Sequence, residues 1–275
     1  SVLSDEIKRT VLDYLDTTFS FQDDTLAESL KEFLLDSEQG MFKGPYVSVR
    51  LPFHKAEIGE RNLSIFPPFT PYVHQIKSFA RLSSQNQQPK PTLVTTGTGS
   101  GKTECFLYPI LDYCYHCNQY ERKTGVKVII MYPMNALASD QAKRLAETIW
   151  NDPRLKGKVT AGLFVGEGVD AKEYPRDMGK DHIIENRDAI LDTVPDILLT
   201  NFKMLDYGLM RQRFMSLWKG NIDTEQKALR FIVLDELHTY DGAQGTDVAN
   251  LIRRLKLKLN LPKNSLCPIG TSATI

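Results

Sequence analysis

A glycine-rich turn followed by lysine and threonine constrains the fold of this chain more than any other feature. Residues 93–104 read LVTTGTGSGKTE, in which an apolar, β-branched run leads into three glycines and then into a helical pattern. Gly97, Gly99 and Gly101 allow the backbone to curl so that successive N–H groups point inward at a helix N-terminus, which makes a nest for an anion. A strand, a glycine-rich turn and a helix in this order favour a phosphate-binding loop over an ordinary turn.

The residues around this turn predict ATP and Mg²⁺ as cofactors. Lys102 is expected to reach the β- and γ-phosphates, and the Thr103 hydroxyl is expected to bind Mg²⁺. Thr96 stands where glycine or alanine is commoner in such loops. The residues expected to surround the nucleotide here are Thr98, Gly99, Ser100, Gly101, Lys102, Thr103 and Glu104.

The pattern from about residue 66 onward alternates between short β-branched runs and helical stretches. Strands are expected at 92–96, 127–132, 159–165, 196–200, 230–235 and 268–272, with helices at 102–119, 136–150, 182–193 and 246–259. This alternation is typical of an α/β fold in which a parallel sheet is covered by helices on both faces. Ligands of such sheets bind beyond the carboxyl ends of the strands, where the glycine-rich turn lies.

A pair of acids forms the second half of the predicted site. Residues 230–238, RFIVLDELH, are an apolar strand that ends in adjacent carboxylates. Asp235 is expected to hold Mg²⁺, and Glu236 to orient and deprotonate the attacking water. Taken alone, this pair is as well explained by two solvated acids at a strand end; together with the phosphate-binding loop it indicates that Lys102, Asp235 and Glu236 are catalytic.

Composition limits the partners of the chain. At 275 residues and 41% hydrophobic, it can bury one sizeable core. Lysine plus arginine and aspartate plus glutamate both number 34, so a nucleic acid must be held by local donors rather than by a basic surface. The absence of a long apolar run and of a disulfide framework predicts a cytoplasmic protein with no membrane partner. Cys114 and Cys117 are expected to pack within a helix rather than to bind zinc.

Beyond these features, the chain resembles the superfamily 2 helicases of DEAD/DEAH-box type over residues 66–275. The similar motifs occur in the family's order: PFTPYVHQ (68–75), TGTGSGKT (96–103), YPMNALASDQ (132–141), DILLTNFKML (196–205), DELH (235–238) and TSAT (271–274). The resemblance implies a RecA-like P-loop domain and an ATP-dependent helicase. Leu237 departs from the family's usual third letter of the acidic motif.

The resemblance also assigns roles to further residues. It implies that Gln75 reads the adenine edge, for which a side-chain amide offers one donor and one acceptor. It implies that His238, Ser272 and Thr274 couple the state of the γ-phosphate to the domain interface through hydrogen bonds. Contacts to consecutive phosphates of a single nucleic-acid strand are expected from Pro133, Asn135, Ala136, Thr200 and Asn201.

The stretch DELHTYDGAQGTDVANLIRRLK is similar to the large bacterial and archaeal helicases of the Lhr and mitomycin-repair types. This similarity implies DNA rather than RNA as the substrate, and DNA repair or anti-phage defence as the setting. Two alternatives stay open: an RNA-directed DEAD-box ATPase, and a nucleotide-binding scaffold that does not hydrolyse ATP.

Two domains are expected. Residues 1–60 are predicted to be an accessory element of two amphipathic helices, the second capped by Thr25 and Glu28, with an extended arm at 46–53. Residues 61–275 are predicted to be the first RecA-like domain. Because the sequence stops after TSAT, we expect a second RecA-like domain to be missing, and hydrolysis by this chain alone to be very slow without its arginine finger. The expected partners are therefore a nucleic acid and the rest of a longer helicase chain.

Overall fold

The computed structural model of the chain describes residues 2–19, 21, 23–36, 38–43, 52–57, 62–166 and 174–273. These residues fall into two compact units, Ser1–Pro52 and Phe53–Ile275. Thr274 and most of the arm expected at 46–53 lie outside the described residues.

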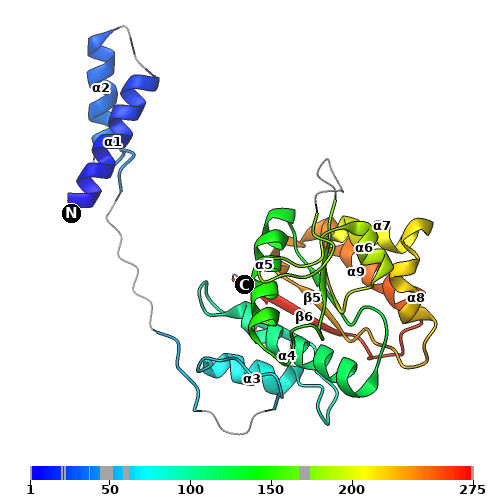
Figure 1. The fold of residues 1–275 in the computed structure, drawn as a ribbon. Coiled ribbons are helices and arrows are strands. Elements are labelled where there is room, and N and C mark those ends of the chain that lie inside the picture. The colour runs from blue at the N-terminus through cyan, green and yellow to red at the C-terminus, as the bar shows by residue number, and fades with distance from the viewer. Residues whose placement is uncertain are drawn as a thin grey trace. The chain divides into compact units, whose positions relative to one another are not determined.

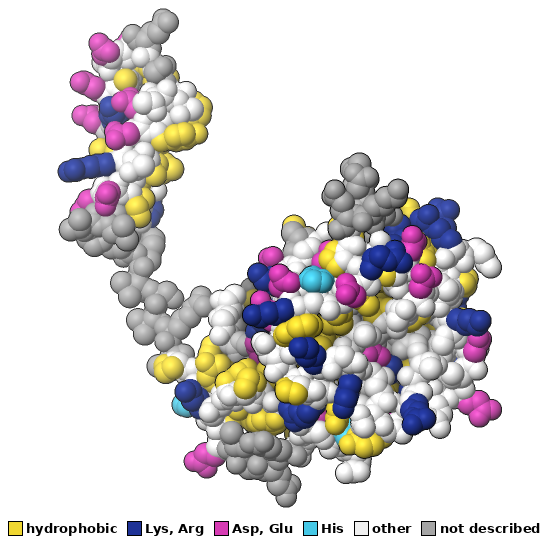
Figure 2. Space-filling model, viewed as in Figure 1, with side chains coloured by type: hydrophobic (Ala, Val, Ile, Leu, Met, Phe, Trp, Pro, Cys, Tyr) yellow, Lys and Arg dark blue, Asp and Glu magenta, His cyan; other side chains and the backbone are white. Residues whose placement is uncertain are grey.

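The first unit contains the two expected helices, α1 (Val2–Thr18) and α2 (Asp24–Leu35) (Figure 1). Asp23 caps α2, because its carboxylate accepts the N–H groups of Thr25 and Leu26 at 2.9 and 3.2 Å. The cap expected at Thr25 was therefore misplaced. Lys31 of α2 bonds to Asp16 of α1 at 2.8 Å. No described residue of α2 is buried, and Figure 2 shows apolar side chains on the surface of this unit.

The second unit is built on a six-stranded sheet in which every pairing is parallel. Its order is β1-β6-β5-β2-β4-β3. All six predicted strands are present: β1 (Thr92–Thr95), β2 (Val128–Met131), β3 (Ala161–Phe164), β4 (Ile197–Thr200), β5 (Phe231–Leu234) and β6 (Cys267–Ser272). The fully buried strands β2 to β5 are covered on both faces, as the apolar runs required.

Helices cover both faces of this sheet, so the predicted α/β fold is confirmed (Figure 1). One apolar cluster joins the sheet to α3, α4 and α5, and contains Phe79, Phe106 and Ala142. The other joins it to the helices that follow β3, and contains Leu205, Trp218 and Leu251. The helices of the second unit are α3 (Val73–Leu82), α4 (Lys102–His116), α5 (Asn135–Asn151), α6 (Arg187–Asp192), α7 (Phe202–Met210), α8 (Ser216–Ile222) and α9 (Gly242–Lys258).

Two helices differ from their predicted lengths. The helix expected at 182–193 begins only at Arg187, because Asn186 caps it and Ile184 pairs with Gly162 of β3. The helix expected at 102–119 ends at His116 and continues as a π-helical turn, Cys117–Glu121.

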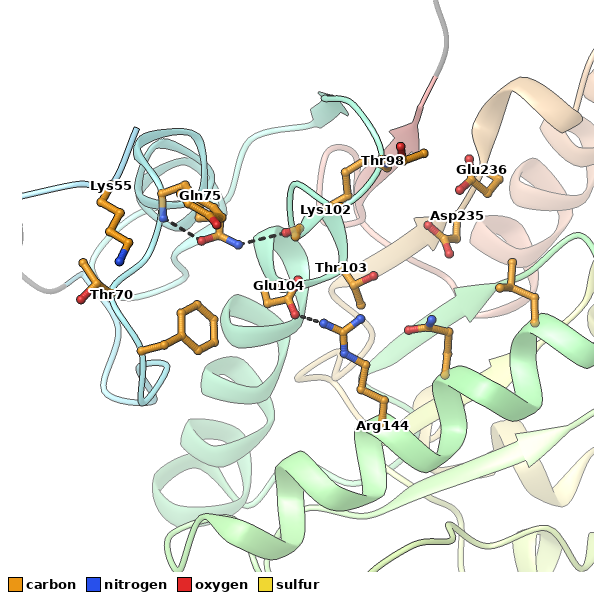
Figure 3. A pocket seen from close by; sticks show the side chains of 16 residues that line it. Lys55, Thr70, Gln75, Thr98, Lys102, Thr103, Glu104, Arg144, Asp235 and Glu236 are labelled. Atoms are coloured by element: carbon orange, nitrogen blue, oxygen red, sulfur yellow. Dashed lines mark hydrogen bonds and ion pairs between the residues drawn. The ribbon is translucent and has the colours of Figure 1, made fainter. Parts of the chain in front are cut away.

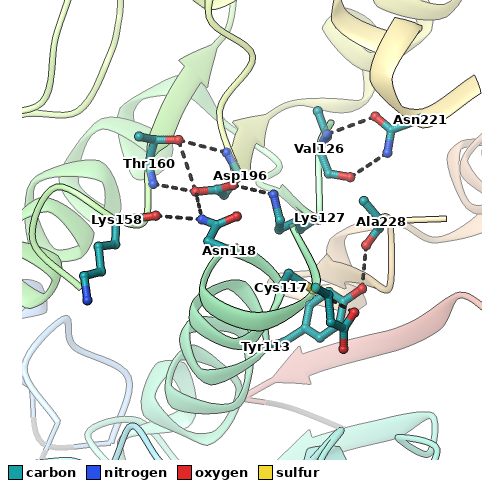
Figure 4. A network of polar contacts seen from close by, with 11 residues as sticks. Tyr113, Cys117, Asn118, Val126, Lys127, Lys158, Thr160, Asp196, Asn221 and Ala228 are labelled. Atoms are coloured by element: carbon teal, nitrogen blue, oxygen red, sulfur yellow. Dashed lines mark hydrogen bonds and ion pairs between the residues drawn. The ribbon is translucent and has the colours of Figure 1, made fainter. Parts of the chain in front are cut away.

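A buried polar network lies at the amino ends of the strands, at the opposite end of the sheet from the glycine-rich turn (Figure 4). Lys127 Nζ lies 2.6 Å from Asp196 Oδ1, and both side chains are at least nine-tenths buried. Asp196 Oδ2 accepts bonds from Asn118 Nδ2 at 2.9 Å and from the Thr160 N–H at 2.8 Å. This carboxylate therefore joins the amino ends of β2, β3 and β4 to the π-helical turn that follows α4.

None of the helices that the structure describes is long and apolar enough to cross a membrane. The described residues contain no cluster of His, Cys, Asp and Glu that would suit a metal. Cys114 and Cys117 are fully buried, and this burial raises the pKa of both thiols, as expected for packed cysteines.

Candidate functional site

The carboxyl ends of β1 and β5 open on a cavity of about 710 Å³ (Figure 3). Its volume lies within the usual range for a small-molecule site. The cavity brings together Lys102, Asp235 and Glu236, the three residues predicted to be catalytic. It also holds most of the residues expected to bind the nucleotide: Gln75, Thr98, Gly99, Gly101, Thr103 and Glu104.

The glycine-rich turn has the backbone expected of an anion nest. Gly99 and Gly101 have φ angles of 76° and 74°, a left-handed conformation that other residues rarely adopt. A β-carbon on Gly97 or Gly99 would meet no atom within 4 Å, so the approach to this turn is open. Lys102 Nζ donates to the carbonyls of Thr96 at 3.0 Å and Gly97 at 3.3 Å, which holds its charge over the same turn.

The unusual Thr96 has a partner inside the turn. Its hydroxyl lies 2.6 Å from the hydroxyl of Ser100, whose side chain is completely buried. The Ser100 side chain therefore packs inside the turn and is not among the groups that line the cavity, so binding of the nucleotide by Ser100 stays a prediction that must use its backbone N–H.

Three hydrogen bonds join helix α3 to the turn and to the first turn of α4. His74 Nε2 donates to the Ser100 carbonyl at 2.9 Å, Gln75 Nε2 to that of Gly101 at 3.1 Å, and the Ser78 hydroxyl to that of Cys105 at 3.0 Å. Gln75 Oε1 also accepts the N–H of Tyr72 at 2.8 Å, and only 1% of Gln75 is exposed. An adenine contact by Gln75 stays a prediction that must use the remaining hydrogen-bonding capacity of this amide.

The two acids lie where β5 meets β6. The Thr271 hydroxyl donates to Asp235 Oδ1 and accepts the N–H of Glu236 at 3.1 Å. Burial raises the pKa of Asp235, and the bond from Thr271 opposes that shift. Glu236 adopts a left-handed conformation with φ of 50°, which turns the chain directly after the strand.

Of the residues expected to couple the site to other domains, His238 and Ser272 are in contact. His238 Nδ1 lies 3.1 Å from Ser272 Oγ and 3.4 Å from Glu236 Oε2. This contact joins the DELH and TSAT segments. Thr271, which sequence reasoning did not assign, is the hydroxyl of that second segment that contacts both acids.

The residues present suit ATP with Mg²⁺. The cavity combines an open anion nest, a lysine beside it, and a hydroxyl and a buried carboxylate from Thr103 and Asp235. Oxygen ligands of this kind are those that Mg²⁺ prefers beside phosphates.

The segments expected to bind nucleic acid meet at the ends of β2 and β4. Asn201 caps α7 and donates to Asn135 Oδ1 at 2.7 Å, so two segments 66 positions apart are joined. Asn135 is exposed and begins α5, and Pro133 beside it is half-buried. Thr200 is fully buried with its hydroxyl bonded to the Phe164 carbonyl at 2.6 Å, so its side chain does not reach the surface. The Ala136 side chain lies outside the described atoms.

Several lining residues were not predicted. The segment before α3 contributes Lys55, Phe69, Thr70 and Tyr72, and α5 contributes Leu137, Gln141 and Arg144. Arg144 forms an ion pair with Glu104. None of these contacts follows from local pattern, because they depend on how α3 and α5 pack around the turn.

Comparison with known proteins gives a family match. A model of the DEAD/DEAH box helicase family matches residues 72–275. The uncharacterized ATP-dependent helicase MJ1574 of Methanocaldococcus jannaschii is 30% identical over 75% of this chain, and Druantia protein DruE of Escherichia coli is 24% identical over 95% of it. The chain spans only 26% and 20% of these two relatives.

Solved structures have the same fold. The crystal structure of the DUF1998 helicase MrfA bound to DNA and AMPPNP matches with a TM-score of 0.53 and 29% identity, over 74% of this chain and 24% of MrfA. The Mycobacterium smegmatis helicase Lhr bound to ssDNA and AMP-PNP matches with a TM-score of 0.54 and 23% identity, over 75% of this chain and 23% of Lhr. At that identity the Lhr match supports the fold alone.

Proposed function

Since this chain belongs to the DEAD/DEAH box helicase family, we propose that it is the ATP-binding motor domain of a DNA helicase or translocase. The observation that carries the proposal is the single cavity that gathers Lys102, Asp235 and Glu236 beside an open anion nest. The family match agrees with the resemblance predicted from the motifs.

Each side chain has a defined part in hydrolysis. Lys102 exchanges its backbone partners for phosphate oxygens and holds the β- and γ-phosphates. Thr103 and Asp235 would hold Mg²⁺, which would neutralise charge on the phosphates. The oxygen of the attacking water forms a bond to the γ-phosphorus while the bond from that phosphorus to the oxygen shared with the β-phosphate breaks. Glu236 accepts the proton that this water loses.

The contacts around Glu236 connect this reaction to the rest of the motor. Its N–H is bonded to Thr271, and His238 lies between its carboxylate and Ser272. We propose that loss of the γ-phosphate alters these bonds and so shifts the population of domain arrangements.

Efficient hydrolysis is proposed to require a second RecA-like domain. Arg144 is the one arginine among the described residues that line the cavity, and it is already paired with Glu104. An arginine supplied from outside typically accelerates such reactions by about three to five orders of magnitude. The relatives are much longer than this chain, which leaves room in them for such a domain.

DNA is the proposed nucleic acid because MrfA, at 29% identity, was solved with DNA and a nucleotide analogue. Asn135 and Asn201 present small polar groups at two helix N-termini, which suit phosphates of one strand. The mixture of acidic and basic side chains in Figure 2 agrees with binding through such local donors. The RNA alternative rests on DEAD-box proteins such as Mss116, solved with ssRNA, whose 20% identity supports the fold alone.

Fluorescence anisotropy with labelled oligo-dT and oligo-U, in the presence of a non-hydrolysable ATP analogue, tests this choice. We expect tighter binding of oligo-dT, and an affinity reduced roughly threefold to tenfold by Asn135→Ala, the loss of one or two phosphate contacts. Asn151→Ala, at the far end of α5, is the matched control and is expected to change nothing. Preferred binding of oligo-U would support the RNA alternative, and equal effects of both variants would refute the role of Asn135.

A further inference from the structure

The first turn of α4 carries a carboxylate that the phosphate chemistry does not use. Glu104 follows Thr103 directly, and one of its oxygens pairs with Arg144 of α5. Its Oε2 is buried and makes no hydrogen bond to any residue that the structure describes. A buried acceptor without a donor is unfavourable because it has lost water without replacement. Because Glu104 lines the cavity, a small turn of its carboxylate on ligand binding can bring this unpaired oxygen to the cavity surface.

The position of this carboxylate indicates which part of a ligand it faces. A β-carbon on Gly101 would lie 3.0 Å from Glu104 Oε2 and would clash with the amide nitrogen of Gln75. Glu104 is therefore close to Gln75, at the end of the cavity expected to hold the base. Its neighbour Thr103 marks the phosphate end (Figure 3). In a nucleotide the ribose joins these two parts.

We propose that Glu104 recognises the ribose, and that its carboxylate accepts a hydrogen bond from the 2′- or 3′-hydroxyl of bound ATP. The inference rests on the proposed binding of ATP in this cavity. A carboxylate can only accept, and the ribose hydroxyls can donate, so the two groups are complementary. A hydrogen bond to an ionised acceptor is stronger than one between neutral groups. Glu104 thus makes the site selective for ribonucleotides over deoxyribonucleotides.

Arg144 explains how a carboxylate is tolerated beside a triphosphate. Its guanidinium offsets the negative charge of Glu104, which would otherwise repel the phosphates. The same ion pair keeps the carboxylate at this wall of the cavity. Arg144 is thus a positioning residue, which acts on the ribose through Glu104.

Nucleotide competition tests the proposal. ATP, 2′-deoxy-ATP and 2′,3′-dideoxy-ATP would be titrated against an ATP analogue labelled on its γ-phosphate, so that the label leaves the sugar free. We expect the wild-type chain to bind dideoxy-ATP about tenfold more weakly than ATP, the ratio for one charge-assisted hydrogen bond. In Glu104→Ala this ratio should fall to about one.

Two further variants guard against indirect effects. Glu147→Ala removes an exposed carboxylate one turn beyond Arg144 and should keep the wild-type ratio. Glu104→Gln keeps an acceptor oxygen without its charge and should give an intermediate ratio, with folding checked by circular dichroism. Lys102-dependent binding with equal affinity for all three nucleotides would overturn the ribose inference alone. A wild-type chain that binds no ATP would overturn the proposed function and this inference with it.

Discussion

At the residue scale, the site depends on a hydroxyl that contacts both acids. Thr271 is fully buried, and it donates to Asp235 and accepts from the backbone of Glu236. Burial raises the pKa of Asp235 because it disfavours the ionised carboxylate, and the hydrogen bond from Thr271 opposes this shift because it stabilises that form.

Thr271→Val should therefore destabilise the fold. The variant keeps the shape of the side chain but leaves Asp235 and the Glu236 N–H without this partner, which should lower the free energy of unfolding by about 1–3 kcal/mol. Thr271→Ser retains the hydroxyl and should lose less than half as much. Urea unfolding of the three proteins measures the differences, and equal stability of the valine and serine variants would contradict this role.

Sequence reasoning predicted the position and backbone geometry of the glycine-rich turn well, because both are set by local residues. The spacing of Gly97, Gly99 and Gly101 before Lys102 defines the turn without reference to the rest of the fold. The roles of Thr271 and Arg144 could not be predicted from the sequence, because they depend on which strands and helices become neighbours. Thr200 shows the reverse, since its place at the end of β4 was correct while its side chain points into the protein.

At the scale of elements, the two ends of the strands have different roles. The carboxyl ends of the strands carry the cavity, and the amino ends carry the buried network around Asp196. The network holds the strands in place at the ends that lie away from the cavity. The strands themselves were predictable from their apolar runs, whereas the late start of α6 depends on Ile184 pairing with β3.

Asp196→Ala should cost stability without loss of nucleotide affinity. It leaves Lys127 charged, buried and unpaired, which typically costs about 3–5 kcal/mol. Asp192→Ala is the control, because Asp192 is 74% exposed and lies 3.9 Å from Arg176, also exposed. Its effect should stay within about 0.5 kcal/mol. Chemical unfolding of both variants checks the contrast, and a loss below about 1 kcal/mol for Asp196→Ala would mean that the network contributes little.

At the scale of the whole molecule, the described core lies within the second unit. Both apolar clusters consist of residues from Leu63 onward, and the first unit presents exposed apolar helices. The second unit holds the nucleotide cavity and the joined Asn135 and Asn201. ATP and nucleic acid are thus expected to meet the same sheet, at neighbouring strand ends.

Binding of ATP in the presence of Mg²⁺ tests the central claim most directly. Isothermal titration of the wild-type chain and of Lys102→Ala, each with Mg²⁺ and with EDTA, compares the predicted phosphate and metal contacts in one series. The account predicts one ATP site in the wild type. EDTA should weaken the affinity of this site for ATP, and Lys102→Ala should reduce that affinity at least tenfold, because a charge-assisted contact to phosphate is lost. Binding that is unchanged in Lys102→Ala would contradict it, because the nucleotide would then lie somewhere other than the glycine-rich turn.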